Sequence, residues 1–138
     1  MSEKDGNKSI LSGVPSSMPS LIKAFRMQEK AANVGFDWDD KEGAWEKLHE
    51  EIAEVEAEMK AGNKVNCEKE LGDLIFSVVN VARLNGINPD NALELTNAKF
   101  RRRFNYVEEM SKGQGKRLND MTLAEMDALW DEAKSNGL

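Results

Sequence analysis

Two pairs of acidic residues flank a glycine at equal distances and could hold a divalent cation. Within each pair the residues are three apart, so both side chains project from one face of a helix within about one turn. If the chain folds back at Gly62, Glu54 comes level with Glu70. Glu51 comes level with Asp73 in the same way. Four carboxylates at one height repel one another and resist burial unless a cation compensates them.

Carboxylate oxygens alone select a hard cation. Mg²⁺ suits this site because it is usually held by a few carboxylates, keeps waters and takes phosphate oxygens. We therefore predict Mg²⁺, for which Mn²⁺ could substitute, on all four acids. The alternative is a solvated acidic face, which we expect for Glu56, Glu58 and Glu68. Glu50 points about 100° away from Glu51 on a helix, so orienting a water, binding a second metal and facing solvent all stay open for it.

A basic pair lies at a matching height on the next predicted helix. Reflection about Ile87 puts Lys99 level with Ile75 and Arg103 level with Leu71. Lys99 and Arg103 also share a face, being four apart. An ammonium and a planar guanidinium opposite a metal site are what a polyphosphate needs. The alternative is ordinary salt bridges with the neighbouring acids, and both could hold in turn.

Composition narrows the class of protein. A chain of 138 residues is long enough for one domain with a core, so we predict a flexible tail at 1–9 and one domain at 10–138. The net charge of −6 argues against a general nucleic-acid surface. Cys67 is the only cysteine, which rules out an intrachain disulfide and a cysteine metal site. No apolar run of membrane-spanning length or secretory start occurs, so we expect a cytoplasmic protein without a membrane partner.

Start and stop signals divide the chain into helices. The first predicted helix is 19–34, with Pro19 at its first position, and the second runs from a cap at Asp39 or Asp40 to Gly62. The third is 64–85. The fourth begins at Asn88-Pro89 and breaks at Gly113 and Gly115, and a capping box at Thr122 opens the last helix. Short connections between long helices imply antiparallel neighbours. The predicted fold class is all-α, an antiparallel helical bundle of four main helices plus a C-terminal helix.

Apolar residues recur at helical spacing and are expected to face inward. The apolar positions on the second and third helices are broad enough for protomers to pair, but periodicity does not separate a core from an interface. A homodimer is therefore an expectation. The expected inward residues are Trp45, Leu48, Ile52, Val55, Met59, Leu71, Leu74, Ile75, Val78, Val79, Ala82, Leu93, Thr96, Phe100, Phe104, Val107, Leu123, Met126 and Trp130.

Other catalytic motifs can be set aside. Glu46 and His49 match the Glu-x-x-His spacing of di-iron bundles, but such a site needs two of these motifs and His49 is the only histidine. No Walker-type or dinucleotide glycine motif is present, and one histidine leaves no Ser-His-Asp or Cys-His arrangement. Any catalysis is expected to be assisted by a metal.

Several motifs in order resemble one family, over about residues 11–134. Glu-Glu-x-x-Glu followed by Glu-x-x-Asp is similar to the MazG nucleoside triphosphate pyrophosphohydrolases, and most of all to the C-terminal catalytic domain of two-domain bacterial members. The companion N-terminal domain of those proteins has no counterpart in these residues. The other matching segments are 11–15, Val-Gly-Phe-Asp-Trp at 34–38, Glu-Leu-Gly-Asp-Leu at 70–74, Val-Asn-Val-Ala-Arg at 79–83 and Thr-Asn-Ala-Lys-Phe at 96–100.

The resemblance implies an all-α fold, a dimer, Mg²⁺ dependence and hydrolysis of a nucleoside triphosphate to the monophosphate and pyrophosphate. Carried over residue by residue, it implies metal ligation by the four acids named above. It also implies triphosphate contacts from Lys99 and Arg103 and a substrate contact from Asn97. Phe36 and Trp38, in a predicted loop, could stack a base or serve as core plugs.

The sequence thus predicts a metal-dependent hydrolase that serves in nucleotide-pool housekeeping. A carboxylate, either Glu50 or one of the ligands, is expected to accept the proton of the attacking water. Lys99 and Arg103 are expected to hold the leaving pyrophosphate. The alternative is a non-catalytic helical dimer that binds metal and nucleotide as a sensor or scaffold, because its ligands would look the same.

Overall fold

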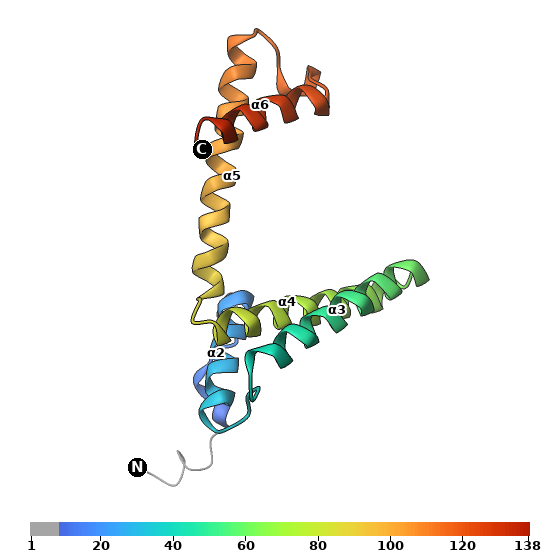
Figure 1. Cartoon of the computed structure of the whole chain (residues 1–138), viewed down its shortest axis with the longest axis vertical. Helices are drawn as coiled ribbons and strands as arrows, with labels where there is room; N and C mark the ends of the chain where they lie inside the picture. The colour runs from blue at the N-terminus through green and yellow to red at the C-terminus, as the bar shows by residue number, and fades with distance from the viewer. Residues whose placement is uncertain (1–8) are drawn as a thin grey trace. The chain divides into compact units, whose positions relative to one another are not determined.

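The computed structural model describes residues 9–138, and every regular element among them is helical (Figure 1). The predicted all-α class, with four long helices and a C-terminal helix, is confirmed. Of the predicted tail, 1–8 lie outside the described residues, whereas the Ser9 side chain caps the first 3-10 helix. The elements are η1 (Ile10–Gly13), α2 (Ser20–Asn33), α3 (Lys41–Ala61), α4 (Lys64–Leu84), α5 (Pro89–Gly113), η2 (Leu118–Asp120) and α6 (Leu123–Ser135).

The chain divides into two compact units, which are described separately. The first ends at Asp90 and the second begins at Asn91, near the start of α5. A single domain over 10–138 therefore stays a prediction. None of the described helices combines the length and the apolarity needed to cross a membrane.

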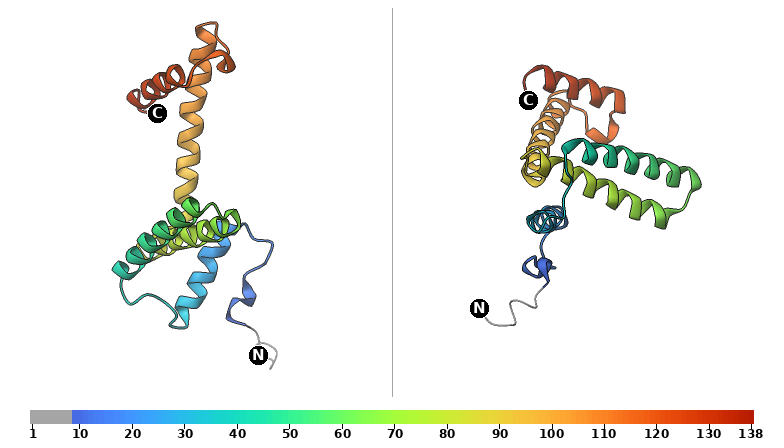
Figure 2. Two further views of the ribbon diagram at one scale, coloured as in Figure 1. Left: turned by 90° about the vertical axis from the view of Figure 1, so that its right-hand side faces the viewer. Right: turned by 60° about the horizontal axis from the view of Figure 1, so that its bottom comes forward.

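An antiparallel hairpin of α3 and α4 is the centre of the first unit, and α2 packs against α4 (Figures 1 and 2). The turn is short because Gly62 adopts the left-handed conformation, with φ of 73°, that a glycine reaches without strain. Asn63 then caps α4 by accepting a hydrogen bond from the Asn66 amide. At the other end of α3, Asp40 accepts from the Gly43 amide over 2.8 Å, which decides between the two predicted caps.

The predicted helix ends are confirmed with small differences. Pro19 is the residue before α2 with an extended backbone, and not its first helical residue as predicted. Asn85 follows α4 as its C-cap: its side-chain Nδ2 donates to the Val81 carbonyl over 2.7 Å, and its backbone N–H donates to the carbonyls of Val81 and Ala82. The Asn88 side chain accepts from the Asp90 amide at the start of α5, as a cap before a first-turn proline should.

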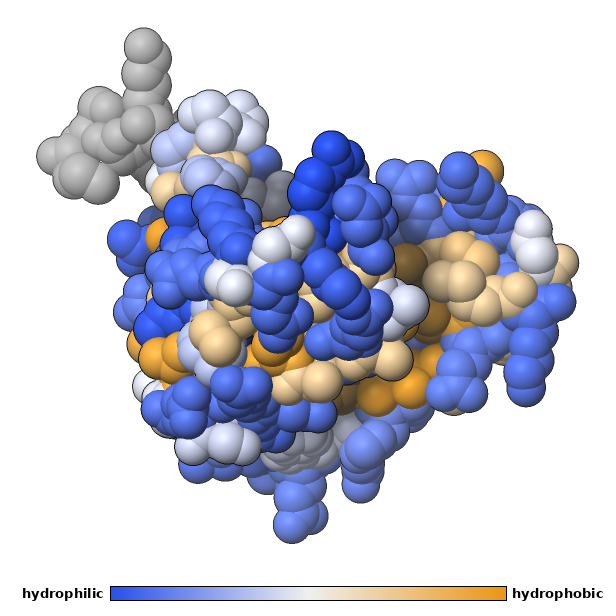
Figure 3. All heavy atoms as spheres, turned by 90° about the horizontal axis from the view of Figure 1, so that it is seen from above, coloured by the Kyte–Doolittle hydropathy of each residue, from blue (hydrophilic) through white to orange (hydrophobic). Residues whose placement is uncertain are grey.

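Many apolar residues that were predicted to face inward are exposed. Ala44, Val55, Cys67, Val79 and Val81 are buried in the first unit. A helix hairpin covers only one stripe of each helix, so the remaining apolar positions reach the surface, where orange side chains lie between blue ones in Figure 3. The predicted inward residues that are exposed are Trp45, Ile52, Met59, Leu71, Ile75, Val78, Leu93, Thr96, Phe100, Phe104 and Leu123.

The second unit has a small core of its own. Val107, Met121 and Leu129 are buried together, and Met126 and Trp130 pack against them as predicted. The predicted capping box opens α6: the Thr122 side chain accepts from the Glu125 amide, and the Glu125 carboxylate accepts from the Thr122 amide. Lys116 adds an ion pair to the same carboxylate over 2.6 Å.

The Glu125 carboxylate should stabilise the second unit in a pH-dependent way. The Lys116 ammonium, with the Thr122 amide, lowers the pKa of Glu125 to about 2. Because the folded pKa lies below the ordinary value of 4.5, the stabilisation is present above that pH and is lost as the pH falls toward 2. We expect Glu125→Gln to lower the melting temperature by a few degrees at neutral pH, and the difference to shrink in acid.

Circular dichroism melts of both proteins at several pH values test this expectation. Glu109→Gln, an exposed position on α5, is the control for loss of a carboxylate. Equal melting temperatures of the Glu125 variant and the natural chain at neutral pH would contradict it.

Candidate functional site

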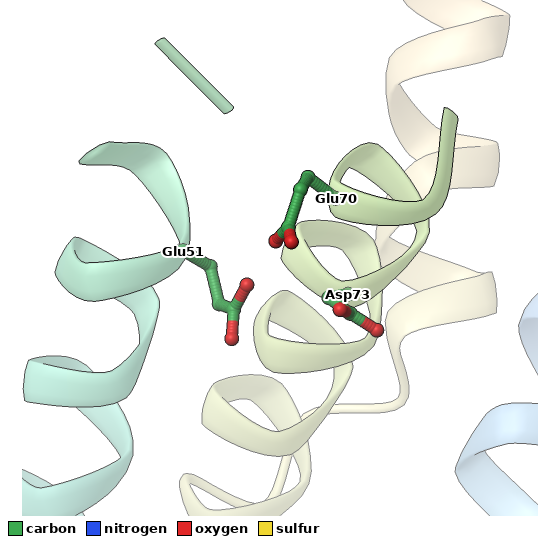
Figure 4. A group of neighbouring side chains, drawn as sticks. All are labelled: Glu51, Glu70 and Asp73. Atoms are coloured by element: carbon green, nitrogen blue, oxygen red, sulfur yellow. The ribbon is translucent and has the colours of Figure 1, made fainter. Parts of the chain in front are cut away.

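Three of the predicted metal ligands meet between α3 and α4. One carboxylate oxygen from each of Glu51, Glu70 and Asp73 lies within 4.8 Å of the other two. Figure 4 shows Glu51 reaching from α3 toward α4, which carries Glu70 and Asp73 about one turn apart. Glu51 is only 4% exposed, Glu70 is half-buried and Asp73 is exposed. The cluster therefore has one side within the hairpin and one side open to solvent.

A lysine compensates part of this charge. Lys47, one turn before Glu51 on α3, brings its ammonium to 2.9 Å from a Glu51 oxygen. This contact is the main reason why the pKa of the Glu51 carboxyl is lowered despite its burial. The pKa of Lys47 is raised by the same pairing. Glu51 is therefore ionised at neutral pH.

Glu70 is the acid at which electrostatic repulsion from the neighbouring carboxylates remains. A hydrogen bond with the Glu54 carboxyl, loss of solvent and the nearby charges of Glu54, Glu51 and Asp73 raise its pKa to about 7. A proton held by Glu70 relieves the repulsion below that pH, in the way that like charges sharing a site normally do. Above that pH no proton relieves it, and a cation would.

The donor set fits a hard cation. Glu51 Oε2 and Glu70 Oε2 are buried and have no hydrogen-bond partner among the described residues. Buried carboxylate oxygens without a donor are costly, so a ligand with positive charge is the natural partner for both. Carboxylate oxygens in this number would suit Mg²⁺ or Mn²⁺.

The other two acids lie at the edge of the cluster. Glu54 is exposed and is not one of the three acids whose oxygens meet, but it is the main cause of the raised pKa of Glu70. Glu50 faces solvent, with an oxygen 3.8 Å from the Lys47 ammonium. It therefore shares a counter-ion with Glu51 without joining the cluster. The metal-binding role of the four acids stays a prediction.

The predicted phosphate contacts belong to the second unit. Lys99 and Asn97 are exposed on α5. Arg103 donates from Nε to the Leu138 carbonyl over 3.0 Å, and its guanidinium lies 5.5 Å from the centre of the Trp130 ring. The guanidinium is thus held in place by α6 and the residues after it. Whether these side chains face the acids stays a prediction.

The loop between α2 and α3 carries the two predicted aromatic residues. Phe36 is 83% exposed, so it is not a core plug. The Trp38 ring packs on Gly43 of α3. The contact is so close that a Cβ at position 43 would lie only 3.0 Å from the ring. Asp37 between them accepts two hydrogen bonds from Arg83, over 2.7 and 3.1 Å, which fasten the loop to α4. These bonds also lower the pKa of Asp37.

The comparison with protein families agrees with the geometry. A model of the MazG nucleotide pyrophosphohydrolase domain matches residues 40–108, which is half of the chain. The chain belongs to the MazG family. The predicted resemblance is confirmed, and the family is one of hydrolases by the name of its domain. The four acids, Lys99 and Arg103 all fall within the matched range, whereas Phe36 and Trp38 precede it.

Relatives of this MazG chain extend the similarity beyond the matched range. The nucleoside triphosphate pyrophosphohydrolase/pyrophosphatase MazG of Thermotoga maritima is 39% identical over 117 residues, 85% of this chain and 45% of that protein. The nucleoside triphosphate pyrophosphohydrolase of Escherichia coli K12 is 38% identical over 128 residues, 91% of this chain and 49% of that protein. An uncharacterized Bacillus subtilis protein, YabN, is 49% identical over 127 residues but is covered to only 26%. The chain thus spans about half the length of the pyrophosphohydrolases it matches.

Sequence reasoning missed Lys47 and the polar residues behind the aromatic loop. Lys47 stands four residues before Glu51, a spacing that would have suggested the ion pair. Asn80 and Arg83 stand three apart in the segment 79–83, a spacing that would have suggested their mutual hydrogen bond. The contact of Arg83 with Asp37, 46 residues away, comes only from the packing of the loop on α4.

Removing one charge from the cluster should stabilise the metal-free protein. Because the pKa of Glu70 is raised to about 7, its ionisation costs stability as the pH rises from 4.5 through that value. Without divalent cations at pH about 8, we expect Glu70→Gln to melt at a higher temperature than the natural chain. Near pH 5 the two proteins should converge.

Added Mg²⁺ should reverse the order of the two melting temperatures, so that the natural chain melts above Glu70→Gln. Binding to the folded state raises the melting temperature of the natural chain by mass action, whereas the variant has lost a ligand. Scanning calorimetry with and without Mg²⁺ measures both effects, and Glu68→Gln, exposed on the same helix, is the control. Equal stabilisation of Glu70→Gln and the natural chain by Mg²⁺ would refute ligation by Glu70.

Proposed function

We propose that this chain hydrolyses nucleoside triphosphates to the monophosphate and pyrophosphate, with Mg²⁺ held by Glu51, Glu54, Glu70 and Asp73. The observation that carries the proposal is the acid cluster, in which two buried carboxylate oxygens lack a partner. A purely structural cluster would gain stability by losing one of these charges. A bound cation would explain why the chain holds these carboxylates together.

The names of the relatives support the chemistry. Two proteins that share 38% and 39% identity with this chain are named as pyrophosphohydrolases of nucleoside triphosphates. Because the chain spans about half of their length, the activity of the whole relatives comes to it only as part of this proposal. We extend the proposal to nucleotide-pool housekeeping in the cytoplasm.

The residues divide the work by their chemistry. When bound, Mg²⁺ would supply a Lewis acid that neutralises phosphate charge and makes a bound water more acidic. A carboxylate, either Glu50 or one of the ligands, accepts the proton of the water that attacks phosphorus; Glu50 is exposed and pairs with the same Lys47 ammonium as Glu51. As the new P–O bond forms, the bond between the α and β phosphates breaks, and the negative charge leaves with pyrophosphate. Lys99 and Arg103 neutralise that leaving group.

Hydrolysis of a substrate panel tests the proposal. Purified protein with Mg²⁺ should convert canonical, deoxy and modified triphosphates to monophosphate and pyrophosphate, which ion-exchange chromatography separates. Chelation with EDTA should stop the reaction and added Mg²⁺ should restore it. We expect Asp73→Asn and Glu51→Gln to lower kcat/KM by more than about 100-fold, the upper end of what is lost when a residue that only supports a metal ligand is changed.

Other product patterns distinguish the alternatives. Diphosphate plus phosphate would mean a different bond is broken. Tight binding of nucleotide and Mg²⁺ without products would favour the sensor or scaffold. An Asp73→Asn enzyme that works at the natural rate would refute the assignment of the ligands even if the activity is present. Glu56→Gln, exposed on α3, is the control for charge.

We also propose that the chain is a homodimer that pairs through α4. Leu71, Ile75 and Val78 follow one another at steps of four and three, so they form one apolar stripe, and Ile75 is 54% exposed. Apolar stripes of this kind on a helix hairpin usually pack against a partner. A second copy would cover the stripe with the same residues, as two-fold pairing does.

Mutation of this stripe tests the dimer. We expect the natural chain to elute with the mass of two protomers in size-exclusion chromatography with light scattering. Ile75→Glu should elute as a monomer because a carboxylate cannot be buried without a partner. Ile10→Glu places the same charge on another exposed apolar residue and should remain dimeric. A dimeric Ile75→Glu protein would show that α4 is not the interface.

A further inference from the structure

The loop between α2 and α3 lines a cavity of about 380 Å³. Three aromatic rings line it, together with three polar side chains from α2 and α4. Its volume lies within the range of small-molecule sites, about 300 to 1,000 Å³. The rings belong to Phe36, Trp38 and Phe76, and the polar side chains to Gln28, Asn80 and Arg83.

We propose that this cavity receives the base of the nucleotide and that the side-chain amides of Gln28 and Asn80 select it. The inference rests on the proposed function, because it concerns the same substrate. It adds two specificity-determining residues that the metal site does not contain. A nucleobase is a flat ring with hydrogen-bond donors and acceptors along its edge, and the cavity is complementary to both features.

Gln28 supplies a fixed acceptor. It is 5% exposed, and its Nε2 donates to the Phe76 carbonyl over 3.0 Å. This bond sets the orientation of the amide, since a flipped amide would turn its oxygen toward another oxygen. Gln28 Oε1 is then left buried without a partner in the described part of the chain. A buried acceptor in a lined cavity calls for an N–H group on a ligand.

Asn80 supplies a fixed donor. Arg83 donates to Asn80 Oδ1 over 3.0 Å while its two terminal nitrogens hold Asp37. The oxygen of the Asn80 amide is therefore engaged, and its NH₂ group is the part left for another molecule. None of the hydrogen bonds found among residues 9–138 uses that NH₂ group. An acceptor on α2 and a donor on α4 thus line one cavity.

The aromatic rings supply the flat surface. Trp38 is held against Gly43, and Phe36 beside it is largely exposed. A planar ligand that stacks on these rings would cover Phe36 without needing to displace Trp38. The bidentate contact of Asp37 with Arg83 keeps the loop at the cavity. An apolar ligand could also use the rings, but it would leave the two amides unsatisfied.

The position along α4 agrees with a nucleotide that reaches the metal site. Phe76 and Asn80 follow Asp73 by three and seven residues, so all three lie on one side of the helix. Seven residues span about 10 Å of helix axis. That distance leaves room for the sugar and the first phosphate between the base and the metal-bound part of the triphosphate.

Replacement of Asn80 by Asp tests the amide with little change of shape. The new carboxylate can still accept from Arg83, but it has no N–H group for the base. We compare kcat/KM for each nucleoside triphosphate with kcat/KM for a sugar triphosphate that lacks a base. This ratio should fall about 10-fold or more in Asn80→Asp, because a site built to bond a ligand edge discriminates strongly when a partner is wrong. Asn33→Asp, an exposed residue at the end of α2, should keep the natural ratio.

A binding experiment without turnover tests the base site separately from the proposed hydrolysis. Nucleoside monophosphates are added without divalent cation, and the NMR signals of the Trp38 indole N–H and the Gln28 side-chain NH₂ are followed. Shifts in both signals that Asn80→Asp weakens support the cavity even if no triphosphate is hydrolysed, in which case the proposed function alone fails. Unchanged signals, or hydrolysis whose dependence on the base is the same in Asn80→Asp, would overturn the base site and leave the hydrolase intact.

Discussion

Repulsion among the carboxylates between α3 and α4 is the constraint on which the rest of this structure depends. Glu51 is buried near Glu70, and Lys47 pairs with Glu51 alone of the two. The hairpin holds them together because Gly62 and Asn63 alone separate its two helices. We expect the repulsion to lower the stability of the metal-free fold, and local costs of this kind are typical of sites kept for a function.

A second contact, between Arg83 and Asp37, organises the other end of the same helix. It fastens the aromatic loop to α4, and through Asn80 it also orients an amide toward the cavity. The cluster and the cavity therefore share α4 as a rigid support, with α3 on one side and α2 on the other. A substrate that contacts both sites would have to span a fixed distance, because the length of a single helix changes little on binding.

The sequence predictions are accurate where the interacting residues are close in the chain, and inaccurate where they are far apart in it. Asp40, Gly62 and Thr122 mark helix ends correctly because a cap contacts backbone amides or carbonyls within three or four residues of itself. Apolar periodicity marks the stripe of each helix that avoids water, but it does not say what covers the stripe. Ile75 was expected in a core for that reason, and it lies at the surface of this chain.

The sequence by itself determined the all-α class, the helix ends and the pairing of acids about Gly62, since these depend on near neighbours and on the regular rise of a helix. Tertiary structure alone decided which of those acids are buried, that neighbouring carboxylates raise the pKa of Glu70 to about 7, and that Gln28 meets the Phe76 carbonyl 48 residues away. The physical reason is that burial and long-range hydrogen bonds depend on which helix faces meet. No spacing within one helix contains that information.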